Sequence, residues 1–489
     1  MSLSLKKLAG ETMIYGASTM LGRLLNWFLM PFYIRTLTTY EYGVVVNFYA
    51  VISVLLVVLT YGLETGFFRF SGKGYQENSI FKTLISLLAI TSGTFVLLGF
   101  FLNGTVSDLF YGGDHALAIL LVFLILGIDS FIALPFARLR LKNRPVKFGI
   151  IKLVNIGSNI FFNLLFLLLI PYLIKQNILE GDFVLIYQKF NGVFYVFLSN
   201  ALSSVITFLL LIPQIFHIGS HVDFSILKPI MVYSLPVLFV GITGMITQNI
   251  DKILLPALLK NSGFSELAVY GANFKIGVLM SLFTQSFRFA FEPFFFKNKE
   301  KGMKSYALVM DYFIFFGLII FLGVTLFLDV INIVLTQEYI AGNNIIPVIL
   351  LALLFYGIYF NLSLWYKLTD KTWIGAIFGT IGAGLTVILN ILLVPEIGVL
   401  GSAIALLVGY FVMMVVSWII GHKHYPVPYQ PRKYLIYFVL AAIVFFAAKE
   451  INIEEQFFSY LFKAVIFALF IGSFFVIKRY DKDKISQPE

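Results

Sequence analysis

Apolar runs of about 20 residues recur along nearly the whole chain, and each is long enough to cross a bilayer as a helix. Only 12% of the 489 residues are charged, whereas a soluble globular protein has about 25%. A transmembrane β-barrel would instead show alternating segments of about 10 residues. The sequence therefore predicts an all-α polytopic membrane protein with fourteen spans and short connections. The predicted spans are residues 10–34, 42–63, 80–102, 116–137, 147–170, 190–212, 230–255, 268–290, 305–328, 345–366, 373–394, 399–420, 433–448 and 457–477.

Lys and Arg residues concentrate in alternate connections, which orients the chain by the positive-inside rule. The basic clusters at 138–152 and 297–304 fall on the same side as both termini, so we predict that both termini are cytoplasmic. The net charge of +10 follows from this bias and does not indicate a nucleic-acid partner. Lys6 and Lys7 resemble the start of a signal peptide, but the apolar run behind them is too long and contains Arg23. We therefore predict a retained first span.

The chain also repeats itself at an offset near 228 residues. Tyr42-Gly43 opens the second span and Tyr270-Gly271 opens the eighth. Residues 64–69 match residues 292–297 at the same offset, and residues 156–171 resemble residues 381–395. A repeat of six spans gives two lobes of the same orientation, related by a pseudo-two-fold axis along the membrane normal, with a site expected between them. We predict lobes at 1–215 and 216–425, with the last two spans at 426–489.

Arg23 lies deep inside the first predicted span. Counted from Gly10 at about 1.5 Å per residue, it lies roughly 20 Å into a hydrocarbon core of about 30 Å. A cation at that depth costs at least about 2.5 kcal/mol when it faces lipid. Thr12, Gly16, Thr19 and Asn26 share its helical face. The first span is therefore predicted to line a polar interior.

Other spans also carry polar groups at helical spacing. These groups include Glu64 in span two, Asp129 in span four, Gln248, Asp251 and Lys252 in span seven, and Lys275, Gln285, Arg288 and Glu292 in span eight. Structural roles are open for most of them. Glu64 and Glu292 could pair with nearby Arg69 and Lys297, Arg288 could snorkel to the surface, and Asp251 could pair with Lys252. For Asp129, as for Arg23, depth makes an idle charge expensive, which favours a functional role.

Signals of enzymes and metal sites are absent from the sequence. It has no cysteine, no Walker motif, no H-E-x-x-H and no G-x-S-x-G. The pairs His217/His221 and His422/His424 lack the Cys or carboxylate partners that a metal site needs. We expect no catalytic residues, no metal and no cofactor, apart from a coupled H+ or Na+ ion.

Several loose motifs occur together in this framework. They are R-x-x-N-(x)4-P-(x)3-R at Arg23, Asn26, Pro31 and Arg35, the two Tyr-Gly pairs, Pro236 with Asp251-Lys252, and P-x-x-G-x-x-G-(S/A)-A from Pro395. With fourteen spans in two lobes plus two, the whole chain resembles the Wzx-type lipid-linked oligosaccharide flippases of the multidrug/oligosaccharidyl-lipid/polysaccharide (MOP) exporter superfamily. Relatives usually carry Asp-Arg where this chain has Asp251-Lys252.

The resemblance implies a bacterial inner-membrane flippase that moves undecaprenyl-diphosphate-linked saccharides by alternating access, for surface polysaccharides such as the O-antigen of lipopolysaccharide. It implies the lipid-linked oligosaccharide, membrane lipid and the polysaccharide polymerase or ligase machinery as partners. Our hypothesis for substrate binding names Arg23, Asn26, Arg35, Gln248, Asp251, Lys252, Lys275, Gln285 and Arg288. Asp129, Glu64 and Glu292 are the candidates for ion coupling. An ion-coupled multidrug exporter of the same superfamily is the main alternative, and a membrane-embedded glycosyltransferase or ligase is a further one.

Overall fold

The computed structural model describes residues 21–485 apart from 23, 26, 73–74, 216–221, 298–302, 369–370, 372 and 452–454. Within this part the chain forms helices and connecting turns, with no β-strand. Thirteen of the described helical segments are long and apolar enough to cross a membrane. Most of the predicted first span falls outside the described residues, but residues 27–36 are helical. The prediction of an all-α polytopic membrane protein with about fourteen spans is confirmed.

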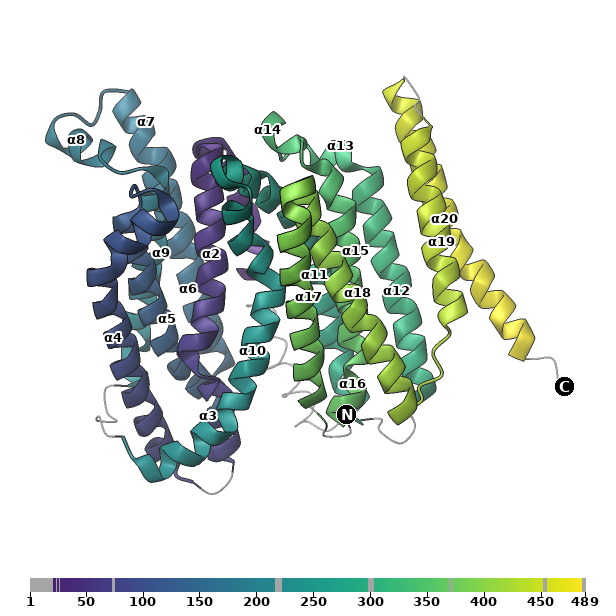
Figure 1. The fold of residues 1–489 in the computed structure, drawn as a ribbon, viewed down its shortest axis with the longest axis horizontal. Coiled ribbons are helices and arrows are strands. Elements are labelled where there is room, and N and C mark those ends of the chain that lie inside the picture. Colours follow the sequence, from purple (N-terminus) through teal and green to yellow (C-terminus); the bar gives the residue numbers. More distant parts are fainter. Residues whose placement is uncertain are drawn as a thin grey trace. The chain divides into compact units, whose positions relative to one another are not determined.

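The chain divides into two compact units, Met1–Ala268 and Val269–Glu489 (Figure 1). Unit 1 contains α2 (Thr39–Thr60), α3 (Leu63–Ser71), α4 (Glu77–Tyr111), α5 (Ala116–Leu141), α6 (Pro145–Leu164), the π-helical turn η1 (Leu165–Leu169), α7 (Ile170–Lys175), α8 (Asp182–Gln188), α9 (Gly192–Leu211), the 3-10 turn η2 (Ile212–Gln214), α10 (Phe224–Leu258), the turn η3 (Lys260–Ser262) and the start of α11 (Gly263–Lys297). Unit 2 continues with α12 (Met303–Leu326), α13 (Leu328–Ile331), α14 (Gln337–Ile340), the turn η4 (Asn343–Ile345), α15 (Ile346–Leu362), α16 (Leu364–Leu368), α17 (Trp373–Ile397), α18 (Val399–His424), α19 (Pro431–Glu450) and α20 (Gln456–Ile485).

Several helices extend well beyond the apolar runs that predicted them. The third span, predicted at 80–102, is the helix Glu77–Tyr111, and the eighth, predicted at 268–290, is the helix Gly263–Lys297. Hydropathy detects only the part of a helix that lies in hydrocarbon, whereas the backbone hydrogen bonds continue through the polar ends. Span five continues through the π-helical turn η1, which precedes Pro171, a residue that has no N–H to donate.

The second span is broken near its end. Tyr61 and Gly62 both adopt left-handed backbone conformations, with φ of 51° and 65°, and separate α2 from α3. A Cβ atom on Gly62 would lie 2.9 Å from the carbonyl oxygen of Ser234 in α10. Glycine is therefore needed here both for the positive φ and for the close approach of α10. The break lets α3 pack its Leu63 and Phe67 into a core with Phe81 of α4 and Ile230 of α10.

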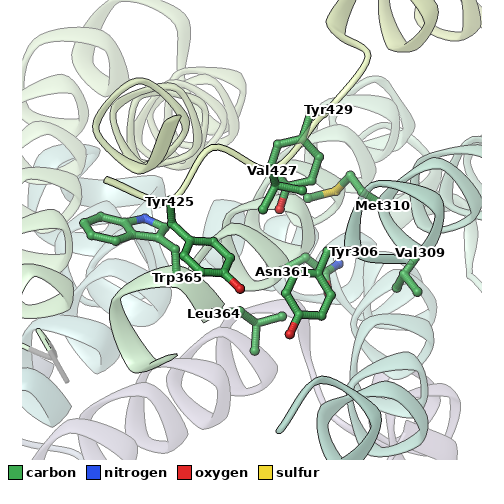
Figure 2. A pocket seen from close by; sticks show the side chains of 9 residues that line it. All are labelled: Tyr306, Val309, Met310, Asn361, Leu364, Trp365, Tyr425, Val427 and Tyr429. Atoms are coloured by element: carbon green, nitrogen blue, oxygen red, sulfur yellow. The ribbon is translucent and has the colours of Figure 1, made fainter. Parts of the chain in front are cut away.

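Unit 2 is built on α12, α15, α17 and α18, which pack on one another in that unit. Two cavities lie where α12, α15 and α18 meet the segment that leads into α19. The first is lined largely by aromatic side chains, among them Tyr306, Trp365, Tyr425 and Tyr429, as Figure 2 shows. The second has a volume of about 170 Å³ and is lined mainly by aliphatic and aromatic side chains. Met310 and Tyr429 line both cavities.

The last two helices are fixed to α12 by polar contacts along its length. The Nζ of Lys433 in α19 lies 2.9 Å from Oδ2 of Asp311 in α12, with both side chains largely buried. Lys463 of α20 reaches Asp329 of α13 at 3.1 Å. Lys478 of α20 donates to the hydroxyl of Tyr312. Between these contacts, the ring of Phe315 stacks on Phe470 and Phe474. The final helix pair is therefore an integral part of unit 2.

We predict unequal costs for breaking the two ion pairs. The change Lys433→Met leaves the Asp311 charge buried without its cation, so it should lower the free energy of unfolding by about 3–5 kcal/mol. Lys463→Met is the matched control, because the Asp329 side chain is 63% exposed and water can replace the lysine; its cost should stay below about 1 kcal/mol. The double variant Asp311→Leu/Lys433→Met should recover most of the lost stability. Equilibrium unfolding in mixed micelles measures all three, and equal losses for the two lysine variants would refute the prediction.

Candidate functional site

Asp129 lies within unit 1 on α5, at a junction with α6 and α9. The hydroxyl of Ser204 in α9 donates a hydrogen bond of 2.8 Å to Oδ1 of Asp129. Lys152 of α6 interacts electrostatically with the same carboxylate. The Nζ of Lys152 also lies 4.3 Å from the ring centroid of Phe136. An intramembrane acid thus has one neutral donor and one cation, an arrangement that can hold, release or exchange a proton or a small cation.

Glu64 connects to this cluster through Arg140. The guanidinium of Arg140 at the end of α5 pairs with the carboxylate of Glu64 in α3 and lies 5.4 Å from the ring centroid of Phe68. Arg140 and Lys152 also interact electrostatically. Glu64 therefore pairs with Arg140 rather than with Arg69, whose guanidinium lies 4.0 Å from the ring centroid of Tyr233. The sequence left open that Glu64 forms an ion pair near a helix end with Arg69. Glu64 does form such an ion pair, but its cation is Arg140.

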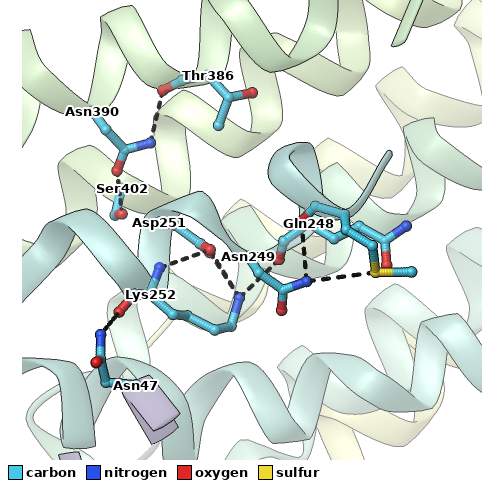
Figure 3. A network of polar contacts seen from close by, with 9 residues as sticks. Asn47, Gln248, Asn249, Asp251, Lys252, Thr386, Asn390 and Ser402 are labelled. Atoms are coloured by element: carbon cyan, nitrogen blue, oxygen red, sulfur yellow. Dashed lines mark hydrogen bonds and ion pairs between the residues drawn. The ribbon is translucent and has the colours of Figure 1, made fainter. Parts of the chain in front are cut away.

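Asp251 and Lys252 form an ion pair in α10, drawn in Figure 3. The Lys252 Nζ lies 2.9 and 3.0 Å from the two carboxylate oxygens of Asp251 and donates to the Gln248 carbonyl at 3.1 Å. Asp251 is fully buried. The Lys252 carbonyl accepts a 2.8 Å hydrogen bond from Asn47 of α2, and Oδ1 of Asn47 accepts one of 2.6 Å from Tyr111 of α4. This group joins α2, α4 and α10 at one end of unit 1.

Three helix N-termini meet beside this group. Glu41 closes a capping box with Thr38 at the start of α2 and also accepts a 2.8 Å hydrogen bond from the backbone N–H of Gly192 at the start of α9. His115 caps α5 and is buried, with its Nδ1 3.1 Å from Nδ2 of Asn191. Helix N-termini carry partial positive charge, which favours the Glu41 carboxylate and disfavours an imidazolium. Burial lowers the pKa of His115, against the opposing effect of Asp114 and Glu41.

Several solved structures share this architecture. The lipid II flippase MurJ in an inward closed conformation superposes with a TM-score of 0.74 at 15% identity, covering 95% of this chain and 99% of its own. An inward-facing multidrug resistance MATE family transporter of the MOP superfamily gives 0.65 at 16% identity, covering 82% and 94%. A MOP superfamily transporter from Pyrococcus furiosus gives 0.55 at 13% identity, covering 85% and 95%. This chain has the fold of MOP superfamily transporters. No protein-family model and no curated protein matches its sequence.

An asparagine close to each Tyr-Gly pair bonds to a distant segment of its own unit. Asn47 of unit 1 donates to a backbone carbonyl and accepts from Tyr111. In unit 2, Nδ2 of Asn273 donates at 2.8 Å to the carbonyl of Tyr339, which follows Tyr111 at the repeat offset of 228 residues. Asn47 follows Tyr42 by five residues and Asn273 follows Tyr270 by three, so the two asparagines are not equivalent at the repeat offset. Asn47 contacts the hydroxyl of Tyr111, whereas Asn273 contacts the backbone carbonyl of Tyr339.

The polar face predicted for span eight packs against α15. A Cβ on Gly277 would lie 2.6 Å from Ile349, and the guanidinium of Arg288 lies 4.7 Å from the ring centroid of Phe360. Lys275 and Gln285 are partly buried. Elsewhere in unit 2, Asn390 of α17 donates to the Thr386 carbonyl at 2.8 Å and accepts from Ser402 of α18 at 2.5 Å (Figure 3). The α11 face thus contributes to helix packing along part of its length.

The remaining predicted residues have mixed positions. Arg23, Asn26 and the side chain of Glu292 lie outside the described residues. Arg35 is exposed and donates to the carbonyl of Pro31 one turn earlier in its own helix. The structure brings Gln248, Asp251 and Lys252 together, and pairs Glu64 with Arg140, whose charge is felt by Lys152 near Asp129. These residues belong to unit 1, whereas Lys275, Gln285 and Arg288 belong to unit 2.

Three charged or polar contacts escaped the sequence reasoning. Asp311 is the one acidic residue inside the predicted ninth span, a signal that could have marked it as a buried ion-pair partner. Arg140 was assigned only to a basic cytoplasmic cluster, although it lies at the end of α5 and pairs with Glu64. Asn47 is a polar residue in the apolar second span, five residues after Tyr42.

We predict that acidification destabilises the junction at His115. The unfolded pKa of histidine is about 6.5, and the pKa of buried His115 is lower, so its contribution to stability is present above about pH 6.5 and is lost as the pH falls toward the folded value. A second ring proton would also face the Asn191 amide donor. The variant His115→Gln should therefore lose less stability between pH 7.5 and pH 5 than the wild type. Melting temperatures across this range measure the difference, and parallel profiles would contradict it.

Proposed function

We propose that the chain is a flippase that moves undecaprenyl-diphosphate-linked saccharide repeat units across the bacterial inner membrane by alternating access. The observation that carries the proposal is the final helix pair α19–α20, held to α12 by the buried Lys433–Asp311 pair. The lipid II flippase MurJ covers 95% of this chain, while the multidrug transporter covers 82%. Because the lipid II flippase matches more of this chain than the multidrug transporter does, a lipid-linked cargo is favoured over a soluble drug.

The chemistry of the cargo agrees with the cations of the spans. A sugar-diphosphate headgroup cannot cross hydrocarbon unaided, so the protein must supply cations inside the membrane while the polyprenyl tail stays in lipid. A guanidinium suits a diphosphate, because its planar fork donates two parallel hydrogen bonds. We assign this role to Arg23 and propose that further contacts come from Asn26, Arg35, Gln248, Asp251, Lys252, Lys275, Gln285 and Arg288.

Asp129 is our proposed coupling residue, with Glu64 and Glu292 as further candidates. The Ser204 hydroxyl and the Lys152 cation stabilise the ionised carboxylate, whereas the apolar surroundings stabilise the neutral acid. A carboxylate balanced between these effects can take up H+ or Na+ in one state of the cycle and release it in another. The coupling ion would then drive the lobes between their two orientations.

The proposed lobes remain 1–215 and 216–425, with both termini in the cytoplasm. Under this division α10 belongs to the second lobe, and its packing against α2 and α3 joins the two lobes. The polysaccharide polymerase or ligase machinery would take over the translocated cargo. The alternative, an ion-coupled multidrug exporter, is supported by the MATE neighbours and by an intramembrane carboxylate that could bind a hydrophobic cation.

We predict that Arg23→Ala abolishes export of surface polysaccharide at normal protein abundance, because the diphosphate loses its intramembrane cation. Arg23→Lys should retain part of the activity, since it keeps the charge but not the bidentate geometry. The control is Lys147→Gln, which removes an exposed cation and should export normally. The assay scores surface polysaccharide and the lipid-linked intermediate that accumulates in a deletion strain. Normal export by both Arg23 variants would refute the cationic-cavity argument and favour the drug-exporter alternative.

A second prediction concerns Asp129→Asn, which keeps a group that accepts from Ser204 but removes the titrating charge. Export should fall more than about tenfold and should lose its dependence on the coupling ion. Asp182→Asn removes an exposed carboxylate and serves as control. Export is measured over a range of pH and Na+ concentrations at matched protein levels. Wild-type rates and wild-type ion dependence in the Asp129→Asn variant would exclude Asp129 from coupling.

A further inference from the structure

The larger cavity of unit 2 has the chemistry of a hydrocarbon site. Its volume is about 170 Å³, and its walls include Ile314 of α12, Ile358 of α15, Val415 of α18 and Phe438 of α19. A comparable cavity of about 150 Å³ lined by Leu, Ile and Phe stays dry and takes up small apolar molecules. Water would find few hydrogen-bond partners on these walls. An apolar occupant is therefore favoured over solvent.

The cavity is lined in part by aromatic side chains, and cationic residues lie close to them in the sequence. Trp418 of α18 and Tyr434 of α19 line it, as does Pro431 at the start of α19. Lys423 follows Trp418 by five residues in α18, and Arg432 directly follows Pro431; both side chains are exposed. The neighbouring Lys433 is already balanced by Asp311, so Lys423 and Arg432 supply the net positive charge of this rim. Trp and Tyr with adjacent Lys and Arg are typical of the level at which lipid headgroups lie.

The smaller cavity adjoins the larger one and has more polar walls. It shares Met310 and Tyr429 with the apolar cavity and is lined by Tyr306, Tyr425 and Asn361, whose side chains Figure 2 shows around it. On the other side, α19 exposes Leu435, Ile436 and Val439, which in a membrane face lipid. A lipid lying against α19 thus finds a space for a chain close to cations for a phosphate.

We propose that this cavity holds an acyl chain of an anionic phospholipid of the cytoplasmic leaflet, with its phosphate against Arg432 and Lys423. The positive-inside orientation places this end of α18 and α19 at that leaflet. Basic pockets between membrane helices on the cytoplasmic side bind anionic headgroups. The chain would fill the space between α19 and the helices α12, α15 and α18, next to the Lys433–Asp311 pair. The proposal does not depend on the cargo that the protein carries.

The test uses the purified full-length protein in nanodiscs with a phosphatidylglycerol that carries a diazirine in its acyl chain. Light-induced labelling, mapped by mass spectrometry, should fall on Ile314, Ile358, Val415 and Phe438. A phosphatidylcholine with the same chain should label these residues less, by about fivefold for each rim charge, which is the equivalent of about 1 kcal/mol per charge. Equal labelling by both lipids would overturn the proposal, as would the absence of label from the cavity.

Variants separate the chain site from the headgroup site. Val415→Phe narrows the cavity and should lower the cavity labelling severalfold. The double variant Lys423→Gln/Arg432→Gln leaves the cavity intact but should bring phosphatidylglycerol and phosphatidylcholine to equal labelling; because both side chains are exposed, folding should be unaffected. Arg479→Gln removes an exposed cation at the end of α20 and should change nothing. Labelling by a diazirine polyprenyl phosphate but not by phosphatidylglycerol would instead make the cavity a tail site for the cargo and reject the phospholipid.

Discussion

Asp311 and Lys433 meet between α12 and α19, where neither charge is stable without the other. An ion in hydrocarbon costs several kcal/mol, so each intramembrane charge must find a partner when the helices assemble. The same requirement ties α3 to α5 through the Glu64–Arg140 pair, and the cation of Lys152 in α6 acts on Asp129 of α5 through a longer-range charge interaction. Apolar side chains pack nearly as well against lipid as against protein, so these pairs are what specify which helix lies beside which.

At the junction of the two proposed lobes, the charged residues pair within one helix rather than between two helices. The carboxylate of Asp251 and the ammonium of Lys252 pair with each other inside α10. One link from α10 to α2 is a neutral hydrogen bond from Asn47 to the Lys252 carbonyl, which contributes only about 1 kcal/mol. Alternating access requires a junction that opens without leaving an ion unpaired. A self-paired Asp-Lys on one side and an uncharged amide on the other meet that requirement.

Hydropathy was sufficient to predict the spans, because insertion into a bilayer depends on the composition of each segment. The repeat at 228 residues predicted two related halves, and that division stays a prediction. Pairing between distant residues was not predictable in this way. Glu64 was assigned to nearby Arg69 but pairs with Arg140, because proximity in sequence says little about which helices pack together. Asp311 was overlooked for the same reason, since its partner lies 122 residues away.

The final helix pair, α19 and α20, is attached to α12 and α13 by a few polar contacts. Lys433, Lys463 and Lys478 all reach carboxylates or a hydroxyl on α12 and α13, so the pair is expected to move together with α12 in the proposed transport cycle. Its attachment is tight at these points but leaves a cavity of about 170 Å³ against α15 and α18. An unfilled cavity of that size costs stability, because its walls lose their van der Waals partners. A lipid chain in that space would restore the packing and make the attachment of α19 sensitive to the composition of the membrane.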